Sequence, residues 1–255
     1  MVTISENGLI IEDKTYTGNL YARQQHPDGR PYHTFRTQSV LVDGDDITFR
    51  RCRFENTAGP GEKVGQAIAL YLDGDGIVLE DCDIIGHQDS LFLAPLPPKE
   101  IEEDGFLGPK QYAPRTPREY RFTNCRIYGG VDFIFGGAAA VFEGCEFISV
   151  EPGYVFAPCT PEGQDMGFTI RNCRFVPDMA AWNSGIVTAG SCYIARPWRE
   201  FAKVRLENCY LGEHINPAGW DDWGKTDAHD TILFEEYDSY GPGYVPDERP
   251  PYVIH

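Results

Sequence analysis

The sequence of 255 residues lacks several features that would assign it to a broad class of proteins. It has no run of 18 apolar residues, so we expect no helix that spans a membrane. Its start, MVTISENGLIIED, does not place a basic stretch before an apolar one, so we see no signal peptide. The sequence also has no Asn-x-Ser/Thr sequon. We therefore expect a cytoplasmic protein, the alternative being an exported protein whose leader is missing from this sequence.

Positive charge is scarce. The chain has 22 Lys and Arg against 39 Asp and Glu, which gives a net charge of −17. An acidic surface of this kind argues against nucleic acid or an anionic membrane as a partner. An acidic polymer stays an open alternative, because a cleft can carry its own local cations. Long amphipathic helical patterns are also scarce, whereas 27 glycines and 19 prolines favour many short strands and turns.

The chain has eight cysteines but no C-x-x-C pair, which disfavours a zinc knuckle. Six cysteines instead share one place in a repeated phrase: a short apolar strand, a polar pair, Cys, a polar residue and an apolar residue. The phrases are ITFRRCRF, IVLEDCDI, YRFTNCRI, AVFEGCEF, FTIRNCRF and VRLENCYL, with cysteines at 52, 82, 125, 145, 173 and 209. A shared phrase with variable spacers predicts a solenoid, and units of this length suit an all-β parallel β-helix over residues 1–255. The cysteines would then stack as a buried ladder, which leaves Cys159 and Cys192 unplaced.

Two aspartates stand at the same distance from this ladder. Asp132, in GGVDFIFGG, and Asp89, in GHQDSLF, each lie seven residues after a ladder cysteine. If the cysteines stack, the two carboxylates lie on adjacent strands about 4.8 Å apart. Like charges at that distance push their pKa values apart, so one ionises while the other keeps its proton. The alternative is that two turn aspartates are in register by accident.

A carboxylate pair on a β-helix fits glycoside hydrolysis, β-elimination or ester hydrolysis. Gln66 and Gln88 offer neutral amide donors near the pair, which suit the oxyanion of ester hydrolysis. Arg196 can hold one aspartate ionised, and Trp198 can stack on a sugar. Strict alternation along a strand would place Gln88 and Asp89 on opposite faces, so we expect a bend there, which Gly86 would allow.

The segments GQAIAL, HQDSLF, GGVDFIFGG and ARPW resemble, in order, the four motifs of the pectin methylesterases. The likeness extends over about residues 15–243 and includes AGP at 58–60 and NPAGWDDW at 216–223. The resemblance implies a right-handed parallel β-helix and an activity that needs no metal or cofactor. The expected substrates are pectin or methylated oligogalacturonides, and we expect the protein to act as a monomer.

The resemblance also implies individual roles. Asp132 would be the nucleophile, and Asp89 would be the acid for departing methanol and then the base for water. Gln66 and Gln88 would stabilise the oxyanion, and Arg196 would hold Asp132. The implied sugar contacts are Trp198, Phe135 and Tyr193. The sequence departs from the family pattern at Phe92, Ala195 and Tyr71, and the first coil of the family has no clear counterpart.

The longest gap in the ladder contains residues 93–120, rich in proline, glycine and mixed charge, which predicts a long loop beside the cleft. The alternative is a surface insertion without a role. Two other functions stay open for the whole chain. One is an esterase with the same machinery that acts on a different acyl or polysaccharide ester. The other is a non-catalytic β-helix that binds pectin.

Overall fold

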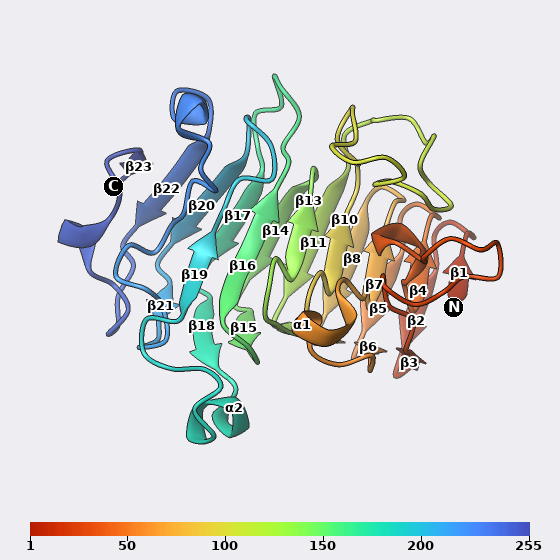
Figure 1. The fold of residues 1–255 in the computed structure, drawn as a ribbon, viewed down its shortest axis with the longest axis horizontal. Coiled ribbons are helices and arrows are strands. Elements are labelled where there is room, and N and C mark those ends of the chain that lie inside the picture. Colours follow the sequence, from red (N-terminus) through yellow and green to blue (C-terminus); the bar gives the residue numbers. More distant parts are fainter.

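The computed structural model describes all 255 residues, which wind into a parallel β-helix (Figure 1). Its strands form three sheets, here called sheets A, B and C, in which every neighbouring pair of strands is parallel. Sheet A contains β1 (Val2–Ile4), β4 (Val40–Val42), β7 (Leu70–Leu72), β10 (Leu91–Leu93), β13 (Ile134–Gly136), β16 (Gly153–Pro158) and β19 (Cys192–Ala195). The predicted all-β parallel β-helix is therefore confirmed.

The other two sheets complete each coil. Sheet B contains β2 (Ile10–Glu12), β5 (Thr48–Arg50), β8 (Ile77–Glu80), β11 (Glu119–Thr123), β14 (Ala139–Glu143), β17 (Phe168–Arg171), β20 (Lys203–Glu207), β22 (Leu233–Tyr237) and β23 (Val253–Ile254). Sheet C contains β3 (Thr15–Gly18), β6 (Arg53–Asn56), β9 (Asp83–Ile85), β12 (Arg126–Gly129), β15 (Glu146–Ser149), β18 (Arg174–Pro177) and β21 (Tyr210–Leu211). Helices are short: α1 (Gly61–Val64), α2 (Met179–Asn183), η1 (Thr34–Arg36), η2 (Thr226–Ala228) and η3 (Pro246–Glu248). None of them is long and apolar enough to cross a membrane.

The strands form because apolar residues alternate with polar ones at the spacing of a half-buried strand. The inward side chains then meet their counterparts in the next coil. In sheet B, Phe122 of β11 pairs in register with Phe142 of β14, and their rings stack with centroids 4.6 Å apart. Repetition of this contact along the molecule gives one continuous core of 48 buried apolar residues.

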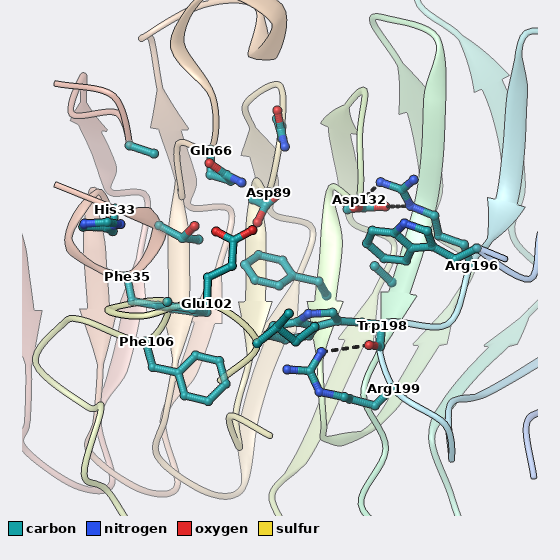
Figure 2. Close-up of a pocket in the computed structure, with 18 of the residues that line it drawn as sticks. His33, Phe35, Gln66, Asp89, Glu102, Phe106, Asp132, Arg196, Trp198 and Arg199 are labelled. Atoms are coloured by element: carbon teal, nitrogen blue, oxygen red, sulfur yellow. Dashed lines mark hydrogen bonds and ion pairs between the residues drawn. The ribbon is translucent and has the colours of Figure 1, made fainter. Parts of the chain in front are cut away.

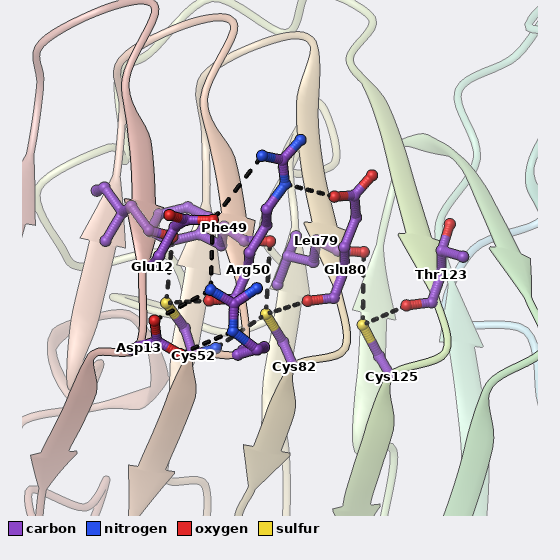
Figure 3. A network of polar contacts seen from close by, with 12 residues as sticks. Glu12, Asp13, Phe49, Arg50, Cys52, Leu79, Glu80, Cys82, Thr123 and Cys125 are labelled. Carbon is purple, nitrogen blue, oxygen red and sulfur yellow. Dashed lines mark hydrogen bonds and ion pairs between the residues drawn. The ribbon is translucent and has the colours of Figure 1, made fainter.

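The cysteine phrase occupies the turn from sheet B to sheet C. All eight cysteines are buried and none forms a disulfide. Cys52, Cys82 and Cys125 line up from coil to coil, with their sulfurs close to backbone carbonyls (Figure 3). The residue before each ladder cysteine has a left-handed backbone, with φ between 50° and 64°, at Arg51, Asp81, Asn124, Gly144, Asn172 and Asn208. Glycine, asparagine and aspartate tolerate this conformation best, which explains why the polar pair ends in them at five of the six positions.

The two cysteines outside the phrase belong to sheet A. Cys192 begins β19, and Cys159 directly follows β16. Both are buried.

Residues 94–118 leave sheet A after β10 and return to sheet B at β11 without forming a regular strand or helix. This segment, here called the cover loop, packs on the outer face of sheet A. Its Phe106 lies edge-on to Phe35, which in turn contacts Phe92 of β10. Lys110 ties the loop down through ion pairs with Asp43 at 2.8 Å and Asp73 at 3.2 Å.

A second packed feature closes the C-terminal end of the coil stack. Arg249 and Glu236 form an ion pair of 2.8 Å in which both side chains are 0% exposed. The Trp220 indole donates to the same carboxylate, and Arg249 also donates to the carbonyl of Pro217 at 2.6 Å. The C-terminal segment is therefore bound to the turn at 216–220, which precedes the residues that reach the cleft described next.

Candidate active site

The stack of coils brings the two aspartates to equivalent places in neighbouring turns. β10 and β13 pair Leu91 with Ile134, and each aspartate lies two residues before its member of that pair. The backbone N–H of Asp89 also donates to the carbonyl of Val131, next to Asp132, at 3.0 Å. The register predicted from the cysteine ladder is thus present in the turn that leads into sheet A.

Both aspartates adopt a left-handed backbone, with φ of 59° at Asp89 and 49° at Asp132. This conformation changes the direction of the chain at the residue itself, so Gln88 and Asp89 both reach one cleft despite being consecutive. The expectation that Gly86 provides the bend is wrong, because its backbone is not left-handed. Gly86 is instead required by close packing, since a Cβ there would lie 2.5 Å from the hydroxyl of Ser90.

Arg196, at the end of β19, grips Asp132 with two parallel hydrogen bonds of 2.8 and 2.7 Å, one to each carboxylate oxygen. The guanidinium lies between two aromatic rings, 3.9 Å from the centroid of Tyr154 and 3.7 Å from that of Trp223. A fork of this kind fixes both the position and the plane of the carboxylate. The two rings leave the guanidinium little freedom to move away.

The surroundings of the two carboxyl groups give them different protonation states. Burial raises the pKa of Asp89 well above its usual value, and the charge of Asp132 raises it further. Burial also raises the pKa of Asp132, but the hydrogen bonds and the charge of Arg196 oppose that rise. The pKa of Asp89 is raised the further of the two, so Asp132 ionises before Asp89 as the pH rises.

Gln66 and Gln88 line the same cleft as the two aspartates. Their main chains are fixed, because the carbonyl of Gln66 accepts from Ala22 and that of Gln88 accepts from Ala67. The Gln88 side chain lies directly against Gly61, where a Cβ would come within 2.6 Å of its Oε1. Two amide groups thus line the cleft beside the carboxyl pair, where they can donate to a developing oxyanion.

The cleft has a volume of about 610 Å³ and lies between sheet A and the cover loop (Figure 2). Trp198 forms one wall, edge-on to Phe135 with centroids 5.8 Å apart and to Phe106 of the cover loop at 6.4 Å. Phe135 is only 3% exposed, so it is a core residue that also lines the cleft. Ile101 and Glu102 of the cover loop also line the cleft, and Glu102 lies close to Asp89 in Figure 2.

The structure does not bring Tyr193 to the cleft, in contrast to its predicted sugar contact. Tyr193 pairs in register with Tyr154, and their rings stack with centroids 5.2 Å apart. Tyr193 therefore packs against Tyr154, whose ring contacts the Arg196 guanidinium. The sequence reasoning missed the two rings that enclose Arg196, although Trp223 ends the segment NPAGWDDW that had been singled out.

An ionised carboxylate held by an arginine, a protonated carboxyl group in the next coil and two amide donors can together carry out nucleophilic acyl transfer. The carboxylate can attack a carbonyl carbon, the amides can stabilise the oxyanion, and the carboxyl group can protonate the leaving alkoxide. No three His, Cys, Asp or Glu side chains converge in a way that could hold a metal ion.

Comparisons with known proteins agree on one family. The pectinesterase family model matches residues 4–95 and 112–252, and the unmatched residues 96–111 belong to the cover loop. The chain is 32% identical to probable pectinesterase/pectinesterase inhibitor 12 of Arabidopsis thaliana over 93% of its length, and 30% identical to a pectinesterase of Petunia integrifolia over 85%. It spans only 39% and 53% of those two proteins.

Solved structures give the same result. The pectin methylesterase of Aspergillus niger matches with a TM-score of 0.79 and 26% identity, covering 100% of this chain and 77% of that one. The pectin methylesterase of carrot matches with a TM-score of 0.75 and 27% identity, covering 99% and 76%.

Proposed function

Because the chain belongs to the pectinesterase family, we propose that it hydrolyses methyl esters of galacturonate in pectin or in methylated oligogalacturonides. The observation that carries the proposal is the in-register pair of Asp89 and Asp132, of which only Asp132 is gripped by an arginine. That asymmetry supplies an ionised nucleophile and a protonated acid in adjacent coils.

The proposed reaction has two halves. Asp132 attacks the ester carbonyl, and the resulting oxyanion is stabilised by the amides of Gln66 and Gln88. The C–O bond to the methoxy group then breaks, and Asp89 gives its proton to that oxygen. Methanol departs, and Asp132 stays joined to the sugar carbonyl as an anhydride. Asp89, now ionised, takes a proton from water, whose oxygen attacks the sugar carbonyl of the anhydride. The anhydride bond to Asp132 then breaks, which restores Asp132 as a carboxylate and Asp89 as an acid. The sugar leaves as the free carboxylic acid, which loses its proton to solvent and becomes galacturonate.

The direct test is an assay of methanol released from methylated polygalacturonate, with Asp132→Asn as the negative control. Steady methanol release that disappears in the variant supports the proposal. Release from acetylated or other esterified polysaccharides, but not from methylated polygalacturonate, would favour an esterase with a different substrate. Binding of the polymer without any release would favour the non-catalytic β-helix.

We also propose that short methylated oligomers are preferred over polymer. The cover loop supports this, because Ile101 and Glu102 stand along one side of the cleft. A test should leave Phe106 in place, since removing it would uncover apolar groups such as Phe92. Replacing residues 101–104 by Gly and Ser should raise kcat/KM for polymer relative to a methylated trimer, and an unchanged ratio would contradict the proposal.

We also propose that the protein acts as a monomer, because one chain supplies every residue of the cleft. A cytoplasmic location stays a prediction.

A further inference from the structure

The turn that carries Asp132 has no room for a side chain where it leaves sheet C. β12 ends at Gly129, and Gly130 follows it directly. A Cβ at Gly130 would lie 2.7 Å from the Cβ of Glu151, which belongs to the next coil. The lack of a side chain at Gly130 therefore lets Glu151 lie directly against this turn.

The partner of Glu151 comes from the coil on the other side of that turn. Its Oε1 pairs with Nδ1 of His87, which is 64 residues away in the sequence. His87 follows β9 and Glu151 follows β15, and β12, which leads to Asp132, lies between those two strands. Neighbouring strands are about 4.8 Å apart, so the pair spans roughly twice that distance. By contrast, the ion pair of Arg126 with Asp83 joins only the adjacent strands β12 and β9.

Backbone hydrogen bonds join the same three coils at this turn. The N–H of Gly130 donates to the carbonyl of His87 at 2.8 Å, and the N–H of Tyr154 donates to the carbonyl of Gly130 at 3.0 Å. The main chain therefore links each coil to the next, and the contact of His87 with Glu151 joins the two outer coils through side chains.

The linked residues stand next to groups of the candidate active site. His87 directly precedes Gln88, which lines the cleft. Gly130 lies two residues before Asp132. The contacts at this turn therefore connect the segment of an oxyanion donor to the segment of the nucleophile. Precise placement of such groups matters, because a displacement of about 1 Å can lower the rate by about 100-fold.

The pair of His87 and Glu151 stays outside the cleft, whose lining includes neither residue. The two side chains are 30% and 15% exposed. An ion pair with this access to water contributes little to the stability of a folded protein. Its effect on the position of the neighbouring turns is therefore the more important one.

We propose that His87 and Glu151 are positioning residues for the reaction. Together they hold the Gly130 turn from both sides, which fixes the separation of Gln88 from Asp132. This inference rests on the proposed function. Neither residue contacts the substrate or transfers a proton, because both act through the turns that they join. Loss of their contact therefore slows the chemical step and leaves the binding of substrate unchanged.

The first test separates kcat from KM in the release of methanol from methylated polygalacturonate. His87→Ala and Glu151→Ala should each lower kcat by about 10- to 100-fold, with KM close to the native value. The double variant should lower kcat no further, because both substitutions remove the same contact. His87→Asn and Glu151→Gln keep a hydrogen-bonding group in place of Nδ1 and Oε1, so each should recover most of the lost kcat.

Asp83→Ala is the matched control. It also removes one acidic side chain and one contact between coils, the ion pair with Arg126 across β9 and β12. Its kcat should stay at the native value. Native kcat in both alanine variants, an equal loss in Asp83→Ala, or losses that multiply in the double variant would overturn the proposal. Failure of the conservative variants to recover kcat, or of the alanine variants to fold, would show a structural role and overturn it as well.

Amide hydrogen exchange tests the same proposal without any turnover. The N–H of Gly130 donates to His87, and that of Asp89 donates to Val131, so both amides report on the joined turns. Both alanine variants should exchange these amides several times faster than the native protein, whereas the control variant should not. Unchanged exchange at these amides would overturn the positioning role. Absence of methanol release by the native protein would overturn the proposed function, while the exchange measurement still decides the role of the pair.

Discussion

The turn before the ladder cysteines and the turn before sheet A use the same backbone conformation for different purposes. At the cysteine turn, each of the six coils places one residue at φ between 50° and 64°, and the outcome is the same every time: a buried sulfur beneath the next one. At the turn into sheet A, the left-handed residues Asp89 and Asp132 occur in two adjacent coils. Repetition therefore builds the scaffold, and departure from repetition builds the site.

The largest effect on activity is expected when the charges of the aspartates at the turn into sheet A are removed. Asp132→Asn and Asp89→Asn should each lower kcat by a factor of about 10³ or more, because one removes the nucleophile and the other the acid for methoxide. Methanol release measures the loss, and circular dichroism checks the fold. Near-native turnover in either purified variant would remove that residue from the mechanism.

The next largest effect is expected at the amides. Gln88→Ala should lower kcat by a factor of about 10²–10³, the usual cost of one oxyanion donor. Gln88→Glu is a useful companion, since it keeps the shape but places an acceptor where a donor is needed. A change confined to KM would show that Gln88 binds the ground state instead.

Substitutions at the two aspartates should change the stability of the protein in different directions, even though both residues are needed for activity. Burial raises the pKa of Asp89 in the folded protein, so the native state holds a proton that the unfolded chain releases above about pH 3.9. Stability is therefore lost as the pH rises from that value through the folded pKa. Asp89→Asn should raise the melting temperature at pH 7, and the gain should vanish below about pH 3.9.

Asp132→Asn should act in the opposite direction. It leaves the Arg196 guanidinium without its carboxylate, which costs about 1.5–3 kcal/mol for a hydrogen bond to a charged group. Burial raises the pKa of Asp132 as well, so removing its buried charge offsets part of that cost. Thermal unfolding of both variants at pH 7 and at pH 3.5 measures the contrast. If both variants melt higher at pH 7 than the native protein, the pairing of Arg196 with Asp132 is less important for stability than burial of the charge.

The smallest effect belongs to the cysteine turn. Cys125→Ala removes one buried sulfur from the ladder and should lower the free energy of unfolding by about 1 kcal/mol, with kcat unchanged. Urea denaturation and the methanol assay measure the two quantities. A loss of activity without a loss of stability would show that the ladder affects the site directly, against the division of labour described above.

These two turns also show what the sequence could and could not reveal. The fixed offset from Cys82 and Cys125 predicted the register of Asp89 and Asp132, because stacked coils repeat their geometry. The bend was assigned to Gly86 because local preference favours glycine, whereas the long-range pairing of Leu91 with Ile134 holds the aspartates themselves in the rarer conformation.

Contacts between distant loops were harder to predict. Trp223 and Tyr154 enclose Arg196 from opposite segments, and no spacing in the chain encodes that meeting. Tyr193 was assigned to the sugar because the family resemblance implied that contact. Its strand pairing turns it toward Tyr154 instead.

The buried pair of Glu236 and Arg249 has a practical consequence for anyone who trims or fuses this protein. A chain cut after β22 would keep every coil that carries an aspartate, yet it would leave Glu236 as an unpaired buried charge, at a cost of about 3–5 kcal/mol. It would also release the carbonyl of Pro217 and the turn that leads to Trp223. Residues that never approach the cleft thus set the shortest stable version of the chain, and an added tag is best attached beyond Val253.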